Sequence, residues 1–79
     1  MKKKIDRYVS DILKKKRHEK GWTQQQLADY CGLKRAFINC LENKEDRLNV
    51  HHINIISDAF GCSPKDFLPD EPILEEEIN

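Results

Sequence analysis

The chain has 79 residues, of which 35% are charged and 38% hydrophobic, and its formal net charge at pH 7 is zero. This length suffices for one small domain, and no stretch approaches the roughly 20 consecutive apolar residues that a membrane-spanning helix needs. The N-terminus is basic but no apolar signal core follows it, so we expect a cytoplasmic protein with no membrane partner.

The first predicted helix covers residues 6–20. Gly21 follows it and is expected to end it, because glycine suits the left-handed conformation at a helix C-terminus. Apolar side chains recur at the i, i+3, i+4 spacing of one helix face, and the stem of a lysine extends the stripe. The stripe comprises Val9, Ile12, Leu13 and Lys16.

The second predicted helix covers residues 23–31. Thr23 is a suitable N-cap, and Gln26 lies three residues later, so a capping box is available. Gly32 is expected to end the helix. The predicted inner face comprises Leu27, Ala28 and Cys31.

The third predicted helix covers residues 34–43 and has two unlike sides. Ile38 and Leu41 fall on one side at 100° per residue, with Phe37 flanking them. The opposite side leaves two interpretations open, a solvated surface and a binding surface. An arc of about 140° on that side holds Arg35, Ala36, Asn39, Cys40 and Asn43.

Two further helices are predicted at residues 50–60 and 64–68. Asn49 is the candidate cap of the first, and Gly61 is expected to end it. Its inner stripe holds Ile53, Ile56 and Phe60, and its apolar surface is widened by Ile55 and Ala59. In the last helix, Ser63 is the candidate cap and Pro64 suits the first position. Asp66 can complete a capping box, and Pro69 is expected to end the helix.

Charge is separated along the chain. Residues 1–20 hold nine Lys or Arg and three Asp or Glu, residues 21–69 hold five and six, and residues 70–79 hold five acids and no base. This asymmetry points to nucleic-acid contact together with an acidic tail. We predict a domain over residues 1–69 and an acidic C-terminal tail over residues 70–79. Three interpretations of the tail stay open. It has no role and is solvated, it shields the basic face or binds a protein partner, or it contributes to dimerisation through Ile73, Leu74 and Ile78.

The glycine-containing turn at residues 31–33 joins two short helices, as in a helix-turn-helix unit. In such a unit the second helix enters the DNA major groove and the first crosses the phosphate backbone. The run TQQQLADYCGLKRAFINCLENK at residues 23–44 resembles the helix-turn-helix of the phage-repressor and Cro-like family, of the xenobiotic-response-element type. Further matches are RxxKGxTQ at residues 17–24 and AFGCSPxDFL at residues 59–68. The resemblance implies an all-α fold, a compact five-helix bundle of lambda-repressor-like type.

The resemblance also implies contacts to DNA. Base contacts are expected from Arg35, Ala36, Asn39 and Cys40. Arg35 is the strongest candidate, because a guanidinium can bind guanine O6 and N7 together. Arg17 has an equally open alternative, an ion pair with Glu42 that braces the motif. Phosphate contacts are expected from Arg17, Thr23, Gln24, Lys34, Asn43 and Lys44.

Within this family, two stretches at residues 34–43 and 47–56 resemble controller proteins of restriction–modification systems, and a prophage or mobile-element repressor is equally open. We expect a homodimer on a roughly palindromic double-stranded DNA operator, because two-fold pairing places two helices about 34 Å apart. The alternative is a protein-interaction module of the same fold, such as an antitoxin or an antagonist of a regulator, with DNA binding secondary. The expected dimer interface comprises Ile55, Ala59, Phe67 and Leu68.

The sequence contains no residue pattern typical of a catalytic, metal-binding or cofactor-binding site, so we expect that the protein is not an enzyme. The cysteines lack C-x-x-C spacing, which argues against zinc and against a disulfide framework. Cys31 and Cys62 are expected to be buried, whereas oxidation of Cys40 on the polar face would block binding. His51 and His52 are expected at a solvated helix start rather than in a metal site.

Overall fold

The structure is a computed structural model that describes residues 3–43 and 47–75. It contains α1 (Lys4–Glu19), α2 (Gln24–Cys31), α3 (Arg35–Asn43), α4 (Val50–Phe60) and a 3-10 turn (Pro64–Phe67). The described residues form no strand, so the all-α prediction is confirmed for them. Among these residues, no helix is long and apolar enough to cross a membrane.

The predicted fifth helix is a single 3-10 turn, which corrects the five-helix bundle to four α-helices and this turn. Ser63 caps the turn through its hydroxyl, which accepts from the Lys65 amide, and Pro64 begins it as predicted. The Leu68 amide donates to the Lys65 carbonyl, an i to i+3 bond. An α-helical bond to that carbonyl would have to come from Pro69, which has no N–H to donate.

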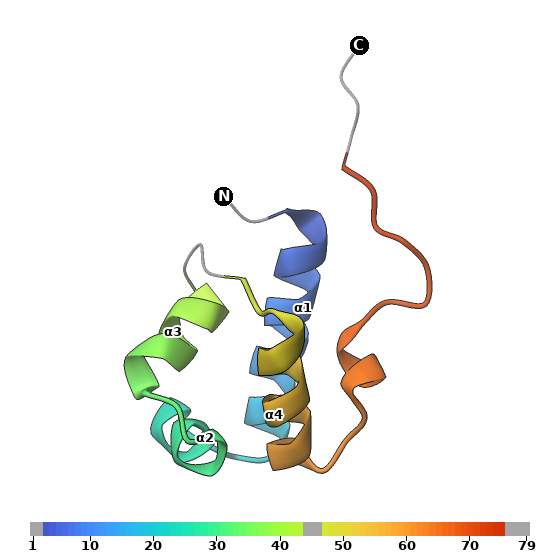
Figure 1. Cartoon of the computed structure of the whole chain (residues 1–79). Coiled ribbons are helices and arrows are strands. Elements are labelled where there is room, and N and C mark those ends of the chain that lie inside the picture. The colour runs from blue at the N-terminus through green and yellow to red at the C-terminus, as the bar shows by residue number, and fades with distance from the viewer. Residues whose placement is uncertain (1–2, 44–46, 76–79) are drawn as a thin grey trace.

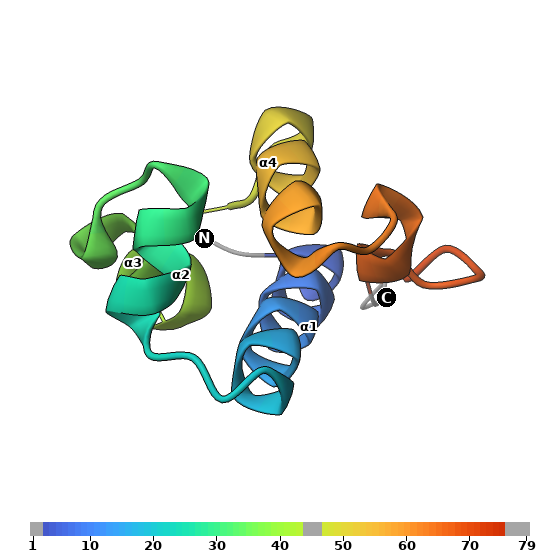
Figure 2. The same ribbon diagram turned by 90° about the horizontal axis from the view of Figure 1, so that it is seen from below.

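The helices α1 and α4 occupy the middle of the molecule, with α2 and α3 on one flank and the 3-10 turn on the other (Figures 1 and 2). Helix α3 packs against both α1 and α2, and α2 also packs against α4. These contacts enclose one apolar core drawn from every element. It comprises Val9, Leu13, Leu27, Ala28, Ile38, Leu41, Ile56, Phe60 and Phe67.

The burial of three residues in or beside this core differs from what the sequence predicts. Cys31 and Cys62 are partly buried rather than buried, and burial together with the nearby Asp58 carboxylate raises the pKa of the Cys31 thiol to about 11. Phe67, expected at a dimer interface, is fully buried within the chain. The structure also buries Arg17 and Ser57, which belong to no apolar stripe in the sequence.

Glu75, within the predicted tail, contacts the start of α1. The side chain of Glu75 accepts a hydrogen bond of 2.6 Å from the backbone N–H of Lys4, the first residue of that helix. A carboxylate is favourable there, because the first turn of a helix carries unpaired N–H groups and the positive end of the dipole. Leu74 is 77% exposed and Ile73 is partly buried, whereas Ile78 lies outside the described residues.

Candidate nucleic-acid interface

Helices α2 and α3 form a compact pair joined by a tight turn. Gly32 ends α2 with a φ of 70°, a left-handed conformation that favours glycine, and the Leu33 amide donates to the Ala28 carbonyl. The Lys34 carbonyl then accepts from the amides of Phe37 and Ile38, which begins α3. The turn thus sets the direction of α3 relative to α2 (Figure 1).

The two predicted sides of α3 are confirmed by burial. Ile38 and Leu41 are both 0% exposed and belong to the core. On the opposite side Arg35 and Ala36 are exposed. Asn43 on that side is also exposed, whereas Asn39 and Cys40 are partly buried. The helix is therefore anchored from behind and offers a polar face outward.

A buried ion pair links α1 to α3. Arg17 Nε lies 2.7 Å from Glu42 Oε2, and Arg17 Nη2 lies 3.0 Å from Glu42 Oε1. Arg17 Nη1 donates to the Trp22 carbonyl at 2.7 Å. All three guanidinium nitrogens are therefore occupied inside the protein. Of the two roles left open for Arg17, the structure supplies the ion pair that braces the motif.

Four further hydrogen bonds extend this pair across the surface of α3. Gln24 Nε2 donates to Glu42 Oε1 at 3.2 Å and to Asn39 Oδ1 at 3.3 Å. Asn43 Nδ2 donates to the same Asn39 oxygen at 3.1 Å, and Lys14 Nζ donates to Asn43 Oδ1 at 2.9 Å. We call Lys14, Asn43, Asn39, Gln24 and Glu42 the polar chain. It fixes the side-chain positions of three predicted DNA-contacting residues relative to one another.

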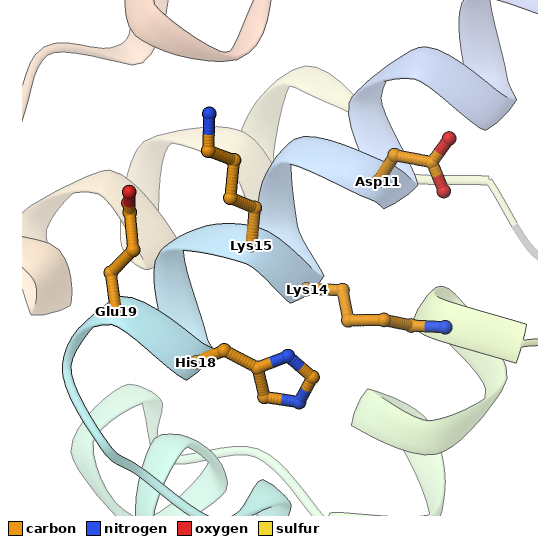
Figure 3. Close-up of a pocket in the computed structure, with 5 residues that line it drawn as sticks. All are labelled: Asp11, Lys14, Lys15, His18 and Glu19. Atoms are coloured by element: carbon orange, nitrogen blue, oxygen red, sulfur yellow. The ribbon is translucent and has the colours of Figure 1, made fainter.

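Sequence reasoning missed Lys14, which brings a cation from α1 to the C-terminal end of α3. In Figure 3 its side chain points from α1 toward α3, away from Lys15 and Glu19 on the same helix. Its partner lies 29 residues away in the sequence, so no local spacing pattern could have predicted the contact. Lys14 therefore joins the candidate phosphate-binding residues.

The other predicted phosphate-contacting residues lie at the starts of α2 and α3. Thr23 is exposed, and its hydroxyl caps α2 by accepting from the Gln26 amide at 3.1 Å. Lys34 is exposed at the start of α3. The capping prediction for Thr23 is confirmed, whereas contact with phosphate stays a prediction. Lys44 lies outside the described residues.

His51 and His52 differ in their surroundings, which corrects their shared assignment to solvent. His51 is exposed, whereas His52 packs edge-on against Phe37 with ring centroids 4.8 Å apart. Burial, and the neighbouring His51, lower the pKa of His52. Its ring also accepts from the Asn49 amide at 3.4 Å, which completes the start of α4. No group of three metal-ligating side chains occurs among residues 3–43 and 47–75.

An apolar groove of about 540 Å³ lies between α4 and the 3-10 turn. In Figure 2 the 3-10 turn and α3 lie on opposite sides of α4. Val50 and Leu68 line it and are 83% and 49% exposed. Of the predicted interface residues, Leu68 therefore lies in the groove, whereas Ile55 and Ala59 are partly buried against the core. The groove is also lined by His51, Ile53, Asn54, Pro64 and Lys65.

Residues 13–67 match the model of a protein family described as helix-turn-helix. A hypothetical transcription factor from Neisseria meningitidis is 34% identical to the chain over 47 residues, and a competence pilus inhibition repressor from Acinetobacter baylyi is 38% identical over 47 residues. Each match covers 60% of this chain but 44% and 43% of the two relatives, so the chain spans less than half of their length.

A similar solved structure is that of the restriction–modification controller protein C.Esp1396I, a tetramer in complex with its natural 35 base-pair operator. The two chains are 30% identical, with a TM-score of 0.76. The similarity covers 84% of this chain and 87% of that chain. It therefore extends over the helix pair and most of the remaining fold.

Mutation of the Arg17–Glu42 pair tests whether it holds α3 against α1. Arg17→Ala leaves the Glu42 carboxylate buried without its partner, so we expect the free energy of unfolding to fall by about 3–5 kcal/mol. The double variant Arg17→Met with Glu42→Leu removes both charges and is expected to recover most of that loss. Urea denaturation measures both.

Arg47→Ala is the control, because Arg47 pairs with Asp6 at 3.1 Å but is 54% exposed. An exposed pair contributes at most about 1 kcal/mol. The bracing role of the Arg17–Glu42 pair is refuted if Arg17→Ala lowers the free energy of unfolding no more than this control does.

Proposed function

The chain belongs to the helix-turn-helix family, and we propose that it is a sequence-specific DNA-binding regulator of transcription. The observation that carries the proposal is the anchoring of α3. Its apolar side is 0% exposed at Ile38 and Leu41, while Arg35 and Ala36 on the other side are exposed. A helix held in this way can enter a major groove without losing contacts to its own fold.

In the proposed complex α3 lies in the major groove. Arg35 donates to guanine O6 and N7, Ala36 contacts a thymine methyl, and Asn39 and Cys40 face base edges. The N-terminus of α2 binds a phosphate through its free amides, since that end of the helix is positive. Arg17 is no longer assigned to phosphate, because its nitrogens are occupied. Phosphate contacts are proposed from Thr23, Gln24, Lys34, Asn43, Lys44 and Lys14.

We also propose that two copies of the chain associate through the apolar groove. Val50 and Leu68 are large, exposed apolar side chains of this groove, and a second copy would remove both from water. A two-fold pair places two recognition helices about one DNA turn apart, which suits a palindromic operator. The tetramer of C.Esp1396I on its operator supports assembly of this kind. Ile55 and Ala59 flank the proposed contact on α4.

The similar proteins are named a transcription factor, a repressor and a controller protein, which supports a regulator rather than an enzyme. Among regulators, the similarity to C.Esp1396I over most of both chains favours the controller type over a prophage repressor. The protein-interaction alternative is less well supported, because the contact that Glu75 of the tail makes is to the chain's own α1.

The base-contact assignment predicts different effects for Arg35 and Lys34. Selection from random duplex DNA with the purified protein should yield a two-fold symmetric motif. Arg35→Ala should then weaken binding to that motif by about 1–3 kcal/mol and relax the preference at one base position. Lys34→Ala should weaken binding to all sequences alike and reduce the salt slope by about 0.9. An Arg35→Ala variant with unchanged affinity and base preference contradicts the assignment.

The proposed dimer predicts an effect of charge in the groove. Leu68→Glu places a carboxylate in the contact, so we expect at least a tenfold weaker dimer by sedimentation equilibrium, with unchanged helix content. Leu74→Glu is the comparison variant, because Leu74 is exposed but does not line the groove, and a dimer weakened by it instead would favour association through the tail. Sedimentation of the unmodified protein as a monomer at high micromolar concentration rules out this interface.

A further inference from the structure

The side-chain amide of Asn39 sits at the middle of the polar chain, where two donors converge on one oxygen. Asn39 Oδ1 accepts from Gln24 Nε2 at 3.3 Å and from Asn43 Nδ2 at 3.1 Å. We propose that Asn39 contacts DNA as a hydrogen-bond donor only and thereby selects guanine or thymine at its base position and disfavours adenine. The proposal rests on the proposed function and names a specificity that the helix-turn-helix fold does not dictate.

One end of the polar chain sets the orientation of Asn43. The Lys14 ammonium has donors and no acceptor, so the atom it contacts at 2.9 Å must be the carbonyl oxygen of Asn43. The amide nitrogen of Asn43 is then the atom that faces Asn39. A nitrogen donor requires an oxygen opposite it, which places Asn39 Oδ1 in this bond.

The other end of the polar chain imposes the same orientation independently. Glu42 is paired with Arg17, and its carboxylate only accepts hydrogen bonds. Gln24 must therefore turn its amide nitrogen toward Glu42, at 3.2 Å. The same nitrogen reaches Asn39 at 3.3 Å and again requires an oxygen there. A flipped Asn39 amide would place nitrogen against nitrogen in both bonds.

The amide nitrogen of Asn39 is consequently left for an external ligand. Among the described residues, none accepts a hydrogen bond from it, and no buried side-chain nitrogen or oxygen lacks a partner. Asn39 Nδ2 therefore reaches solvent. Both lone pairs of its oxygen are already used, so the outward-facing group offers two N–H donors and no acceptor.

This donor-only amide suits some bases and not others. Asparagine usually binds adenine with its oxygen accepting from N6 and its nitrogen donating to N7. In this chain, that geometry would break the two bonds to the Asn39 oxygen. Guanine presents acceptors at both O6 and N7, and thymine presents O4, so both match the donors. Cytosine presents the N4 donor and is mismatched.

The test measures base preference rather than affinity. The selected duplex is re-synthesised with each of the four base pairs at the position whose preference Asn39→Ala abolishes, and binding is measured by fluorescence anisotropy. The unmodified protein should prefer guanine or thymine over adenine by at least about fivefold, the lower end for one well-placed base contact. Asn39→Asp presents an acceptor in the same shape and should shift the preference toward cytosine and adenine.

A second variant tests the polar chain itself. Gln24→Ala combined with Asn43→Ala removes both donors to the Asn39 oxygen, so the side chain can adopt the adenine geometry. Overall affinity should fall, but the ratio of guanine to adenine binding should shrink to within about twofold or reverse. Gln25→Ala is the control, because Gln25 lies on the same helix and bonds Asp29 instead; it should leave the ratio unchanged.

The outcomes separate this proposal from the general one. An enriched motif with adenine preferred at the Asn39 position overturns donor-only recognition and leaves the regulator function standing. A double variant that keeps the original ratio, or an Asn39→Ala variant that changes no position, also overturns it. Failure to enrich any motif removes the proposed function and this inference with it.

Discussion

Arg17 and Glu42 form a bidentate ion pair between α1 and α3, with side chains that are 11% and 1% exposed. Helix α3 has nine residues, and isolated helices shorter than about 12–15 residues are marginal in water. The residue before its first turn is Lys34, whose side chain cannot accept the hydrogen bonds of an N-cap. Packing of Ile38 and Leu41 must therefore supply the stability that the helix lacks alone, while the ion pair fixes its position against α1.

The ion pair also answers an electrostatic problem inside α3. Glu42 lies in the last turn, where the negative end of the helix dipole disfavours a carboxylate. The guanidinium of Arg17 offsets this cost and uses its remaining nitrogen on the Trp22 carbonyl, which ties down the segment between α1 and α2. From Glu42 the hydrogen bonds continue outward through Gln24 to Asn39. A single buried contact thus fixes the position of the helix and orients the polar groups that it presents.

Local sequence signals predicted much of the fold because they act over a few residues. Helix α4 begins and ends as expected, since Asn49 and Gly61 cap it on either side. Helix α1 starts at Lys4 rather than at residue 6, because Asp6 is its third residue and accepts from the Lys3 amide, which stabilises the first turn. The prediction of an α-helix at residues 64–68 was wrong because of Pro69. Its missing N–H was expected only to end the helix, but it also prevents an α-helical hydrogen bond to the Lys65 carbonyl, so the segment forms a 3-10 turn.

Features that depend on distant residues were out of reach of such signals. The polar face of α3 followed from periodicity, but the hydrogen bond from Lys14 and the position of Gln24 required the packing of three helices. Phe67 carries the same apolar character whether it faces the core or a partner, and tertiary contacts decide between them. Val50 was assigned no role because an exposed apolar residue at a helix start belongs to no stripe.

The central claim is that the outward side of α3, held from behind by the core and by Arg17, touches the bases of DNA. Photo-crosslinking of the selected duplex, with 5-iodouracil in place of single thymines, followed by mass spectrometry of the crosslinked peptide, tests it most directly. We expect the crosslinks to fall within residues 34–43. Crosslinks confined to the outer face of α1 around Lys15 and Glu19, or to the groove at Val50 and Leu68, would contradict it.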